Sequence, residues 1–402
     1  RPNSRSFQGG VNISVAGGLF FGVSYLLDGA IHNDIQASSG LPLPFPDALQ
    51  EFRVATSGLS AQNGMHAGAS VNAVTKSGTN VLHGNAFEFL RHKRFNATSV
   101  FASVDPVTGK RRDDGLLRNQ FGGTIGGPIV RDRLFYFGGY QGTATRQTPA
   151  DNIAYVPTPA MLRGDFTTFA SPACNSGRQI ALRAPFVNNQ IDPSQFSPAA
   201  LNLAGRLPQT TDPCGETRFS VPSDRDEGQM IGRLDFQRTS NDSIFGRYMY
   251  TLDKRPAPLA SSDNVLTTTL SAVDNYAQSL TLGDTRVFGA SSVNSLRFAF
   301  NQTVVDRFNE PFFEPKDLGA KVYNYSPTRE MVLAVTGGFN ISASTATRGI
   351  ADNKTFQISE DLTLVRGRHQ LAVGANVAYW DSLQKSWAQG GGTWTFDGSN
   401  TG

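Results

Sequence analysis

Apolar and polar residues alternate along several stretches of this chain. In FQISEDLTLV, which begins at Phe356, the first apolar residues share one face of an extended chain and the polar residues share the other. The stretches 228–238 and 292–305 show the same period of two, which predicts β-strands with one apolar face. These stretches run for about 11 to 14 residues, whereas soluble strands cluster near 5 or 6 and a tilted membrane-spanning strand needs about 9 to 11. Their length therefore favours strands that cross a membrane over a half-buried soluble sheet.

Short turns and long polar loops alternate between the predicted strands. Four short turns fall near residues 131, 240, 290 and 367, while the longest loop covers 147–227. Alternate connections of an up-and-down sheet lie at opposite edges, and bacterial outer-membrane barrels likewise have short turns at one edge and long loops at the other. The pattern predicts a mainly β fold, an antiparallel up-and-down transmembrane β-barrel of which about nine strands are present. We expect these strands at 82–95, 116–127, 133–146, 228–238, 243–252, 275–287, 292–305, 354–365 and 369–382.

The first eighty residues differ from the rest of the chain in their pattern of apolar and polar residues. Short apolar strands are separated by Gly and Pro, which predicts a small globular α/β or β unit. The pair Asp28 and Gly29 in LLDG predicts a turn, and a place on a solute path is the alternative. A polar turn then separates a β-branched strand from an aromatic one, and it consists of Lys76, Ser77, Gly78, Thr79 and Asn80.

The composition agrees with a membrane-embedded wall. The chain is 39% hydrophobic and 17% charged, with 41 Gly and 28 Phe, so charge is lower and Gly and Phe are higher than in a typical soluble domain. The net charge is only +3, and no Lys/Arg run exceeds KRR at 110–112, so nucleic-acid binding has no electrostatic support. The sequence contains no window of 18 apolar residues, so it predicts no transmembrane helix. The chain starts without Met or a signal peptide, and we interpret it as an internal fragment.

Two cysteines, Cys174 and Cys214, lie about 40 residues apart in a loop rich in Pro and Asn. They predict a disulfide formed in an oxidising compartment, and two unpaired thiols are the alternative. Closing that loop would contribute roughly 4 kcal/mol. We expect the loop 147–227 that carries them to be external.

Few residues suggest catalysis or the binding of a metal or cofactor. The five histidines are scattered, and no H-x-x-x-H, G-x-S-x-G or paired-carboxylate pattern occurs, so we expect neither an enzyme, nor a metal site, nor a cofactor. The run FGGTIGGP at 121–128 lacks the G-x-G-x-x-G order. It is expected to let a strand approach another part of the protein closely.

Six motifs, taken in order, resemble the Oar-like branch of TonB-dependent outer-membrane transporters. They are YLLDGAIHND, PFPDALQEFRVATSGLSAQNG, GASVNAVTKSGTNVLHGNAFEFLR, RNQFGGTIGGPIVRDRLFYFGGYQG, VPTPAMLRGDF and FVNNQIDPSQFSP. The resemblance implies a barrel of about 22 strands in a Gram-negative outer membrane, with its lumen closed by an N-terminal plug. Residues 1–80 would then be the C-terminal part of the plug and 81–402 the N-terminal, incomplete part of the barrel. Lys76 to Asn80 would be the hinge between them.

The resemblance also implies a function and partners. It implies plug-gated uptake of a bulky solute of unknown identity, by a monomeric barrel in the lipid bilayer. The energy would come from a TonB-type complex that acts through an N-terminal segment missing here. A structural or adhesive surface protein is the alternative, and a passive porin is a third option that the plug-like segment argues against.

Four arginines lie on the polar faces of the predicted strands. They would point into the lumen, where they could pair with plug carboxylates such as Asp47 or Glu51 or guide an anionic solute. These residues are Arg118, Arg233, Arg247 and Arg297.

Overall fold

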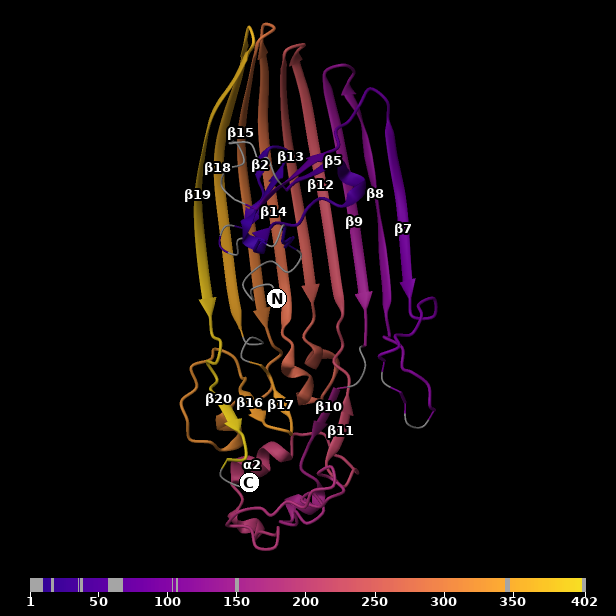
Figure 1. Ribbon diagram of the computed structural model, residues 1–402, viewed down its shortest axis with the longest axis vertical. Coiled ribbons are helices and arrows are strands. Elements are labelled where there is room, and N and C mark those ends of the chain that lie inside the picture. The colour runs from indigo at the N-terminus through magenta and orange to yellow at the C-terminus, as the bar shows by residue number, and fades with distance from the viewer. Residues whose placement is uncertain are drawn as a thin grey trace.

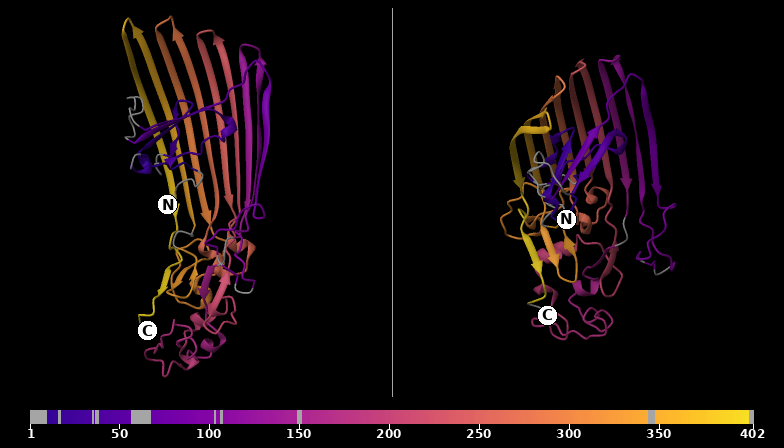
Figure 2. Two further views of the ribbon diagram at one scale, coloured as in Figure 1. Left: turned by 45° about the vertical axis from the view of Figure 1, so that its right-hand side comes forward. Right: turned by 45° about the horizontal axis from the view of Figure 1, so that its top comes forward.

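A tall curved sheet dominates the computed structural model of this chain, with a small N-terminal unit against one face and a loop domain at one end (Figure 1). Figure 2 shows that the N-terminal unit lies on the concave side of the sheet. The structure describes residues 10–15, 18–34, 36, 39–56, 68–102, 104–105, 108–148, 152–343 and 348–399.

The tall sheet, which we call the wall, is one antiparallel meander. Its order is β19-β18-β15-β14-β13-β12-β9-β8-β7, so each strand pairs with the next strand of the meander along the chain. The predicted up-and-down arrangement is therefore confirmed. The strands are β7 (His83–His92), β8 (Leu117–Val130), β9 (Leu134–Arg146), β12 (Arg225–Thr239), β13 (Asp242–Arg255), β14 (Ala272–Phe288), β15 (Ser292–Phe308), β18 (Gly349–Arg366) and β19 (His369–Ser386).

The short turns share one end of the wall and the long connections share the other (Figure 1). This confirms the predicted turns near 131, 240, 290 and 367. Several strands are longer than expected, since β14 and β15 have 17 residues and β18 and β19 have 18. The extra length of β18 includes Asp352 and Asn353, where polar residues hide the alternation that signals a strand in the sequence.

The two faces of the wall differ as the alternation predicts. The outward face carries exposed apolar side chains such as Leu234, Leu282 and Ile358, whereas polar side chains such as Ser279 and Thr281 are buried on the inner face. Phe137, near the start of β9, is an aromatic residue that does not lie on this outward face. Its side chain is 2% exposed and packs inward against the N-terminal unit, because it stands on the same face as Ile231 and Met249.

The N-terminal unit is a four-stranded sheet in the order β2-β1-β6-β5. Its strands β1 and β6 are parallel and the other pairs are antiparallel. Val23, Tyr25, Ala69 and Val71 form its core. Its elements are η1 (Phe20–Gly22), β1 (Val23–Leu27), β2 (Ala30–Ile31), β3 (Asn33–Asp34), β4 (Ser39–Gly40), η2 (Pro46–Ala48), β5 (Leu49–Ala55) and β6 (Ala69–Thr75).

The long polar loops predicted between the strands lie together at the far end of the wall and carry structure of their own. The described residues of 147–224, 256–271, 309–348 and 387–399 fold together, and we call them the loop domain. Its core joins Leu207, Leu266, Phe313 and Leu333, which come from separate connections. Each connection alone carries too few apolar residues to reveal this core. The elements are β10 (Asn152–Tyr155), α1 (Pro159–Leu162), η4 (Pro193–Gln195), α2 (Pro198–Ala204), β11 (Glu216–Phe219), η5 (Pro258–Ser261), η6 (Val265–Thr269), η7 (Pro315–Leu318), β16 (Val332–Val335), β17 (Asn340–Ile341) and β20 (Thr393–Phe396).

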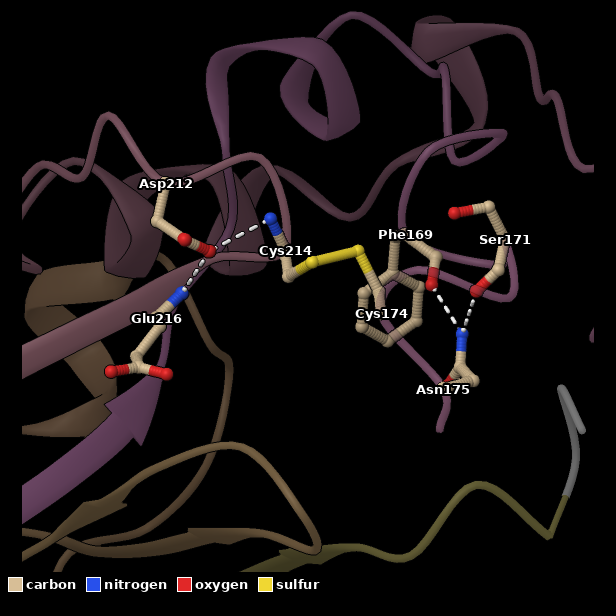
Figure 3. Close-up of a disulfide and its surroundings, with 7 residues drawn as sticks. All are labelled: Phe169, Ser171, Cys174, Asn175, Asp212, Cys214 and Glu216. Atoms are coloured by element: carbon tan, nitrogen blue, oxygen red, sulfur yellow. Dashed lines mark hydrogen bonds between the residues drawn. A yellow bond between two sulfur atoms is a disulfide. The ribbon is translucent and has the colours of Figure 1, made fainter. Parts of the chain in front are cut away.

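A disulfide joins Cys174 and Cys214 inside the loop domain, with their Cα atoms 5.3 Å apart (Figure 3). On one side, the Asp212 carboxylate accepts hydrogen bonds from the backbone N–H groups of Cys214 and Glu216. On the other, the Asn175 amide donates to backbone carbonyls within the same turn. Both cysteines therefore sit in turns that are fixed by side-chain hydrogen bonds. No helix in the described part of the chain has the length and apolarity to cross a membrane.

Candidate functional site

The strongest concentration of buried polar contacts lies where the N-terminal unit meets the wall, and we call this contact the junction. Its centre is the tip of the β1–β2 hairpin. Leu27 pairs with Ala30, so Asp28 and Gly29 form a two-residue turn with φ angles of 53° and 82°. Two positive φ angles in succession are typical of the type I′ hairpin turn, which favours Asp-Gly. The sequence LLDG therefore places a carboxylate at the tip of a tight hairpin.

The Asp28 carboxylate is surrounded by donors from both sides of the junction. Within the N-terminal unit it accepts from the Thr75 backbone N–H (2.9 Å) and hydroxyl (3.0 Å). From the wall it accepts from Arg233 Nη1 (3.0 Å) and Arg247 Nε (3.1 Å). Thr75 is the last residue of β6, so the end of one strand and the tip of a hairpin are fixed to the wall at one point.

Arg247 is fully enclosed. Its side chain and that of Asp28 are each 1% exposed. Its remaining donors reach the Ser279 carbonyl and hydroxyl and the Thr281 hydroxyl on the neighbouring strand. A buried ion pair offsets its desolvation cost only when further hydrogen bonds satisfy both partners, and this pair meets that requirement. Removal of either member would leave the other as an uncompensated buried charge.

The other predicted arginines differ in position. Arg233 also pairs with Asp235, and its guanidinium lies 4.5 Å from the centre of the Phe245 ring. Arg297 lies beside the turn, since its Nε would be 3.5 Å from a Cβ placed on Gly29. Arg118 stands opposite Arg91, towards the loop end of β8, and no described residue forms an ion pair or side-chain hydrogen bond with it.

Two of these arginines, Arg233 and Arg247, do pair with a carboxylate of the N-terminal unit, but it is Asp28 and not the expected Asp47 or Glu51. Asp47 instead accepts from the Asn85 amide of β7 (2.5 Å), and the Glu51 side chain is exposed on β5. The error has a physical origin. Asp28 and Arg247 are 219 positions apart, and no local pattern in the sequence connects them.

Wall side chains also hold the backbone of the N-terminal unit, through contacts that no local sequence pattern predicts. Gln357 Oε1 accepts from the Ile31 N–H, while Asn301 Nδ2 donates to the Ile31 carbonyl, both at 2.9 Å. Gln229 repeats this arrangement, because it accepts from the Phe45 N–H (2.6 Å) and donates to the Leu43 carbonyl (3.0 Å). Amide side chains thus imitate the pairing that a neighbouring strand would provide.

His32 lies next to these contacts and is 1% exposed. Burial, together with the nearby positive charge of Arg247, lowers the pKa of His32 to about 3. Its Nε2 lies 2.9 Å from the Pro42 carbonyl, and its Nδ1 has no hydrogen-bond partner among the described residues. The imidazole is therefore neutral at physiological pH.

An apolar cluster completes the junction. Leu27, Phe45 and Ala73 of the N-terminal unit pack against Phe137, Ile231 and Met249 of the wall. The cluster lies beside the Asp28 contacts, since Ala73 accepts from the Asp28 N–H. Water is thereby kept away from the ion pairs.

The segment Lys76 to Asn80 connects the N-terminal unit to β7 along the short-turn end of the wall (Figure 1). Lys76 N–H donates to the Ala48 carbonyl, so the segment starts at the N-terminal unit. Asn80 then donates to the Asp132 carboxylate in the β8–β9 turn and accepts from the Asp132 N–H. Between them, a Cβ on Gly78 would lie 2.7 Å from the carbonyl oxygen of Gly127, in the glycine-rich run. The linker therefore needs glycine at its closest approach to the wall.

The junction can bind and orient, but it shows no arrangement for covalent chemistry. Within the described ranges, no group of three or more His, Cys, Asp and Glu residues could hold a metal ion. What the geometry provides is a polar attachment between two folded parts, each of which has its own sheet.

Comparison with known proteins defines the class. A family model described as "Outer membrane beta barrel domain" matches residues 74–402. The chain therefore belongs to this family of outer-membrane β-barrels, and the outer membrane is its location. The resemblance to TonB-dependent transporters, which are not enzymes, is confirmed by a relative, the "TonB-dependent transporter Oar" of Myxococcus xanthus, which is 32% identical over 128 residues. That match covers 30% of this chain and 12% of the relative.

Two solved structures show the same fold. The outer membrane transporter YddB from Escherichia coli aligns with a TM-score of 0.54 at 12% identity, over 92% of this chain and 42% of its own. A mutant of the ferric enterobactin receptor PfeA from Pseudomonas aeruginosa aligns with a TM-score of 0.50 at 12% identity, over 96% of this chain and 45% of its own. The chain thus spans less than half the length of these structures.

Proposed function

We propose that the full-length protein takes up a bulky solute through a barrel that the N-terminal unit gates. In this proposal residues 1–80 are the C-terminal part of a plug, and residues 81–402 are the N-terminal part of the barrel. The observation that supports it is the attachment of the N-terminal unit to the concave, polar face of the wall through Asp28 and Ile31. A barrel of this class leaves a lumen too wide for side chains alone to fill, so a unit in this position would obstruct it.

The partners follow from the same proposal. The printed name of the Oar relative supports energy coupling by a TonB-type complex, which would act on a segment ahead of residue 1. The barrel would be a monomer in the lipid bilayer, with the Cys174–Cys214 loop outside the cell, because barrels of this kind carry their long loops there. In this scheme Lys76 to Asn80 act as the hinge and Asp28–Gly29 as the plug turn, and the lumen-facing arginines are Arg118, Arg233, Arg247 and Arg297.

A direct test needs no knowledge of the solute. Thr303 is 2% exposed and donates to Asp34 of the N-terminal unit, so Thr303→Cys reports whether the two parts separate. A pair of further cysteines, Asp47→Cys and Asn85→Cys, can form a disulfide that locks the N-terminal unit to β7, since the native side chains are hydrogen-bonded. Maleimide labelling of residue 303 is then measured in cells by mass spectrometry of the peptide that carries it.

We expect residue 303 to be labelled in cells with an active energy-coupling complex and protected in cells that lack it. The lock should abolish labelling, and reduction of the lock should restore it. Asp47→Cys alone is the matched control, because it cannot form the lock. Equal labelling of residue 303 with and without the energy complex, and with and without the lock, would contradict gated uptake and favour a passive porin.

A surface-binding role is the second candidate, and the folded loop domain favours it. A domain with its own apolar core and disulfide presents a fixed surface that could bind a partner whether or not the lumen opens. Adhesion of cells that carry the locked variant would separate the two functions. Full adhesion with no energy-dependent labelling at residue 303 would support the surface role.

A further inference from the structure

The loop domain contains a cavity of about 390 Å³ that lies away from the junction. It is lined by residues from three separate connections: Arg206 after α2, residues 259–265 around η5 and η6, and residues 310–313 before η7. The volume falls within the range of small-molecule sites, about 300 to 1,000 Å³. Val265 and Phe313 belong to the buried core, so one wall of the cavity is built on the rigid centre of the loop domain.

Three charged side chains line this cavity. Arg206, Asp263 and Glu310 form no ion pair or side-chain hydrogen bond within the described residues. The Arg206 guanidinium is held instead by the Phe313 ring, with its Cζ 5.1 Å from the ring centre. A cation over an aromatic face keeps its in-plane donors available for a ligand.

Asp317, a carboxylate that also attracts Arg206, already has other partners. Asp317 accepts from Arg329 Nη2 at 2.9 Å and from the Glu314 N–H. These hydrogen bonds, first the one from Glu314 and then those from Arg329, hold the pKa of Asp317 below its usual range. Arg206 is attracted to Asp317 but shares no hydrogen bond with it, and among the described residues that line the cavity, Asp263 and Glu310 are the carboxylates.

Apart from Ser262, the remaining lining is apolar. Leu259, Pro311 and Phe312 line the cavity together with the charged groups. Small-molecule sites typically combine such a lining with a few polar groups that fix the orientation of the ligand. A matching ligand carries a carboxylate, an ammonium group and an apolar body between them.

We propose that this cavity binds a short zwitterionic peptide. Arg206 binds the terminal carboxylate through its planar donors, Asp263 and Glu310 bind the terminal ammonium, and the apolar residues contact the side chains between them. The inference deepens the proposed uptake function, and it rests on that function only in treating the bound peptide as cargo. Binding itself needs neither energy nor an open lumen.

Calorimetry on the full-length protein in detergent tests the proposal, with the tripeptide Ala-Phe-Ala as the probe. We expect saturable binding, weakened by about tenfold to a hundredfold when the N-terminus is acetylated or the C-terminus is amidated, because each change removes a charge-assisted hydrogen bond. Free phenylalanine serves as a second probe. Equal affinity for it would contradict a peptide-sized site.

Variants assign each end of the peptide to a residue. In Arg206→Gln, amidation of the peptide should cause no further loss. In the Asp263→Asn and Glu310→Gln double variant, acetylation should cause no further loss. Arg178→Gln, an exposed arginine of the loop domain outside the cavity, is the matched control and should behave as the unmodified protein.

Three further results would overturn the inference. They are the absence of saturable binding, binding that ignores the state of both termini, and an equal loss of affinity in Arg178→Gln and Arg206→Gln. Failure of binding with energy-dependent labelling of residue 303 intact would leave the proposed uptake function standing. If the peptide binds but residue 303 shows no energy-dependent labelling, the proposed uptake function would be overturned and the peptide site would stand.

Discussion

The junction and the loop domain are both buried contacts between segments far apart in the chain, yet they differ in the groups at their centre. The junction relies on a charged centre at Asp28 and on amide side chains that bind backbone groups. The loop domain relies on an apolar core and one covalent bridge. Both regions exclude water. They differ in the free energy that it costs to separate their parts.

Polar groups can exchange their partners for water when they separate, so the net free energy of such a contact is small. Apolar surface has no such exchange, and its exposure to water costs free energy in proportion to its area. A disulfide adds a further constraint that separation cannot remove. If the N-terminal unit moves as proposed, this comparison favours separation at the polar contacts of the junction, while the loop domain would keep its shape.

The largest expected effect follows from Arg247→Met at the junction. It leaves the Asp28 carboxylate buried without its enclosed partner, which should weaken the attachment of the N-terminal unit by about 3 to 5 kcal/mol. The urea concentration at which Thr303→Cys becomes labelled measures this. Addition of Asp28→Asn, which keeps a residue tolerant of positive φ, should recover most of the loss. Additive losses in the double variant would show that the pair is not coupled.

In the loop domain, Cys214→Ser should cost roughly 4 kcal/mol, because the bridge closes a loop of 40 residues. The loss should be local. Limited proteolysis of residues 165–215 during thermal unfolding should begin at a lower temperature, while labelling of residue 303 stays unchanged. Ser171→Ala, beside the bridge, is the control. A simultaneous change at the junction would break the comparison by showing that the two regions unfold together.

The outer face of the wall provides a third environment. Phe298 stands opposite Leu282 and Ile358, which are exposed on the outward face, so Phe298→Arg should cost about 2 to 4 kcal/mol at the bilayer midplane. Arg297→Phe, one position along, should disturb the inner face instead. Reversible folding into lipid vesicles measures both variants. Equal and mild effects would indicate a soluble sheet.

A smaller effect concerns pH. His32 has a pKa of about 3 in the junction, below the ordinary value of 6.5 that it regains on exposure to water. The separated state therefore binds the extra proton first, so attachment is strongest above pH 6.5 and weakens steadily as the pH falls towards 3. Between pH 7 and pH 5 the loss should be about 2 kcal/mol, and His32→Gln should remove this dependence. An unchanged urea midpoint across this range would contradict the neutral, buried imidazole.

The wall was predictable because its information is local. Alternation with a period of two marks each strand, and short polar turns fix which strands are neighbours, as at residues 131 and 240. Even there, polar extensions such as Asp352 and Asn353 escaped the pattern. The order of the strands and the direction in which their side chains face thus follow from the sequence, while the ends of each strand depend on the strands that pair with it.

The junction and the loop domain were not predictable, because their information is spread over the chain. Arg118 and Arg247 lie on similar polar faces, yet only Arg247 meets Asp28, and that depends on how far along its strand each residue stands. The core residues Leu266 and Leu333 come from loops that look polar when taken singly. Only the folded wall brings these segments to the same place.

The paired hydrogen bonds between Asn80 and Asp132 have a mechanical consequence. They fasten the linker to the β8–β9 turn shortly before the first residue of β7, His83. Tension along the linker would load both bonds together, in shear, before it reached the backbone ladder between β7 and β8. Ladders that are pulled from one end peel one bond at a time, which requires little force, whereas this anchor spreads the load onto a second hairpin. The first strand of the wall is thereby shielded from being unzipped by the movement of the part to which it is tied.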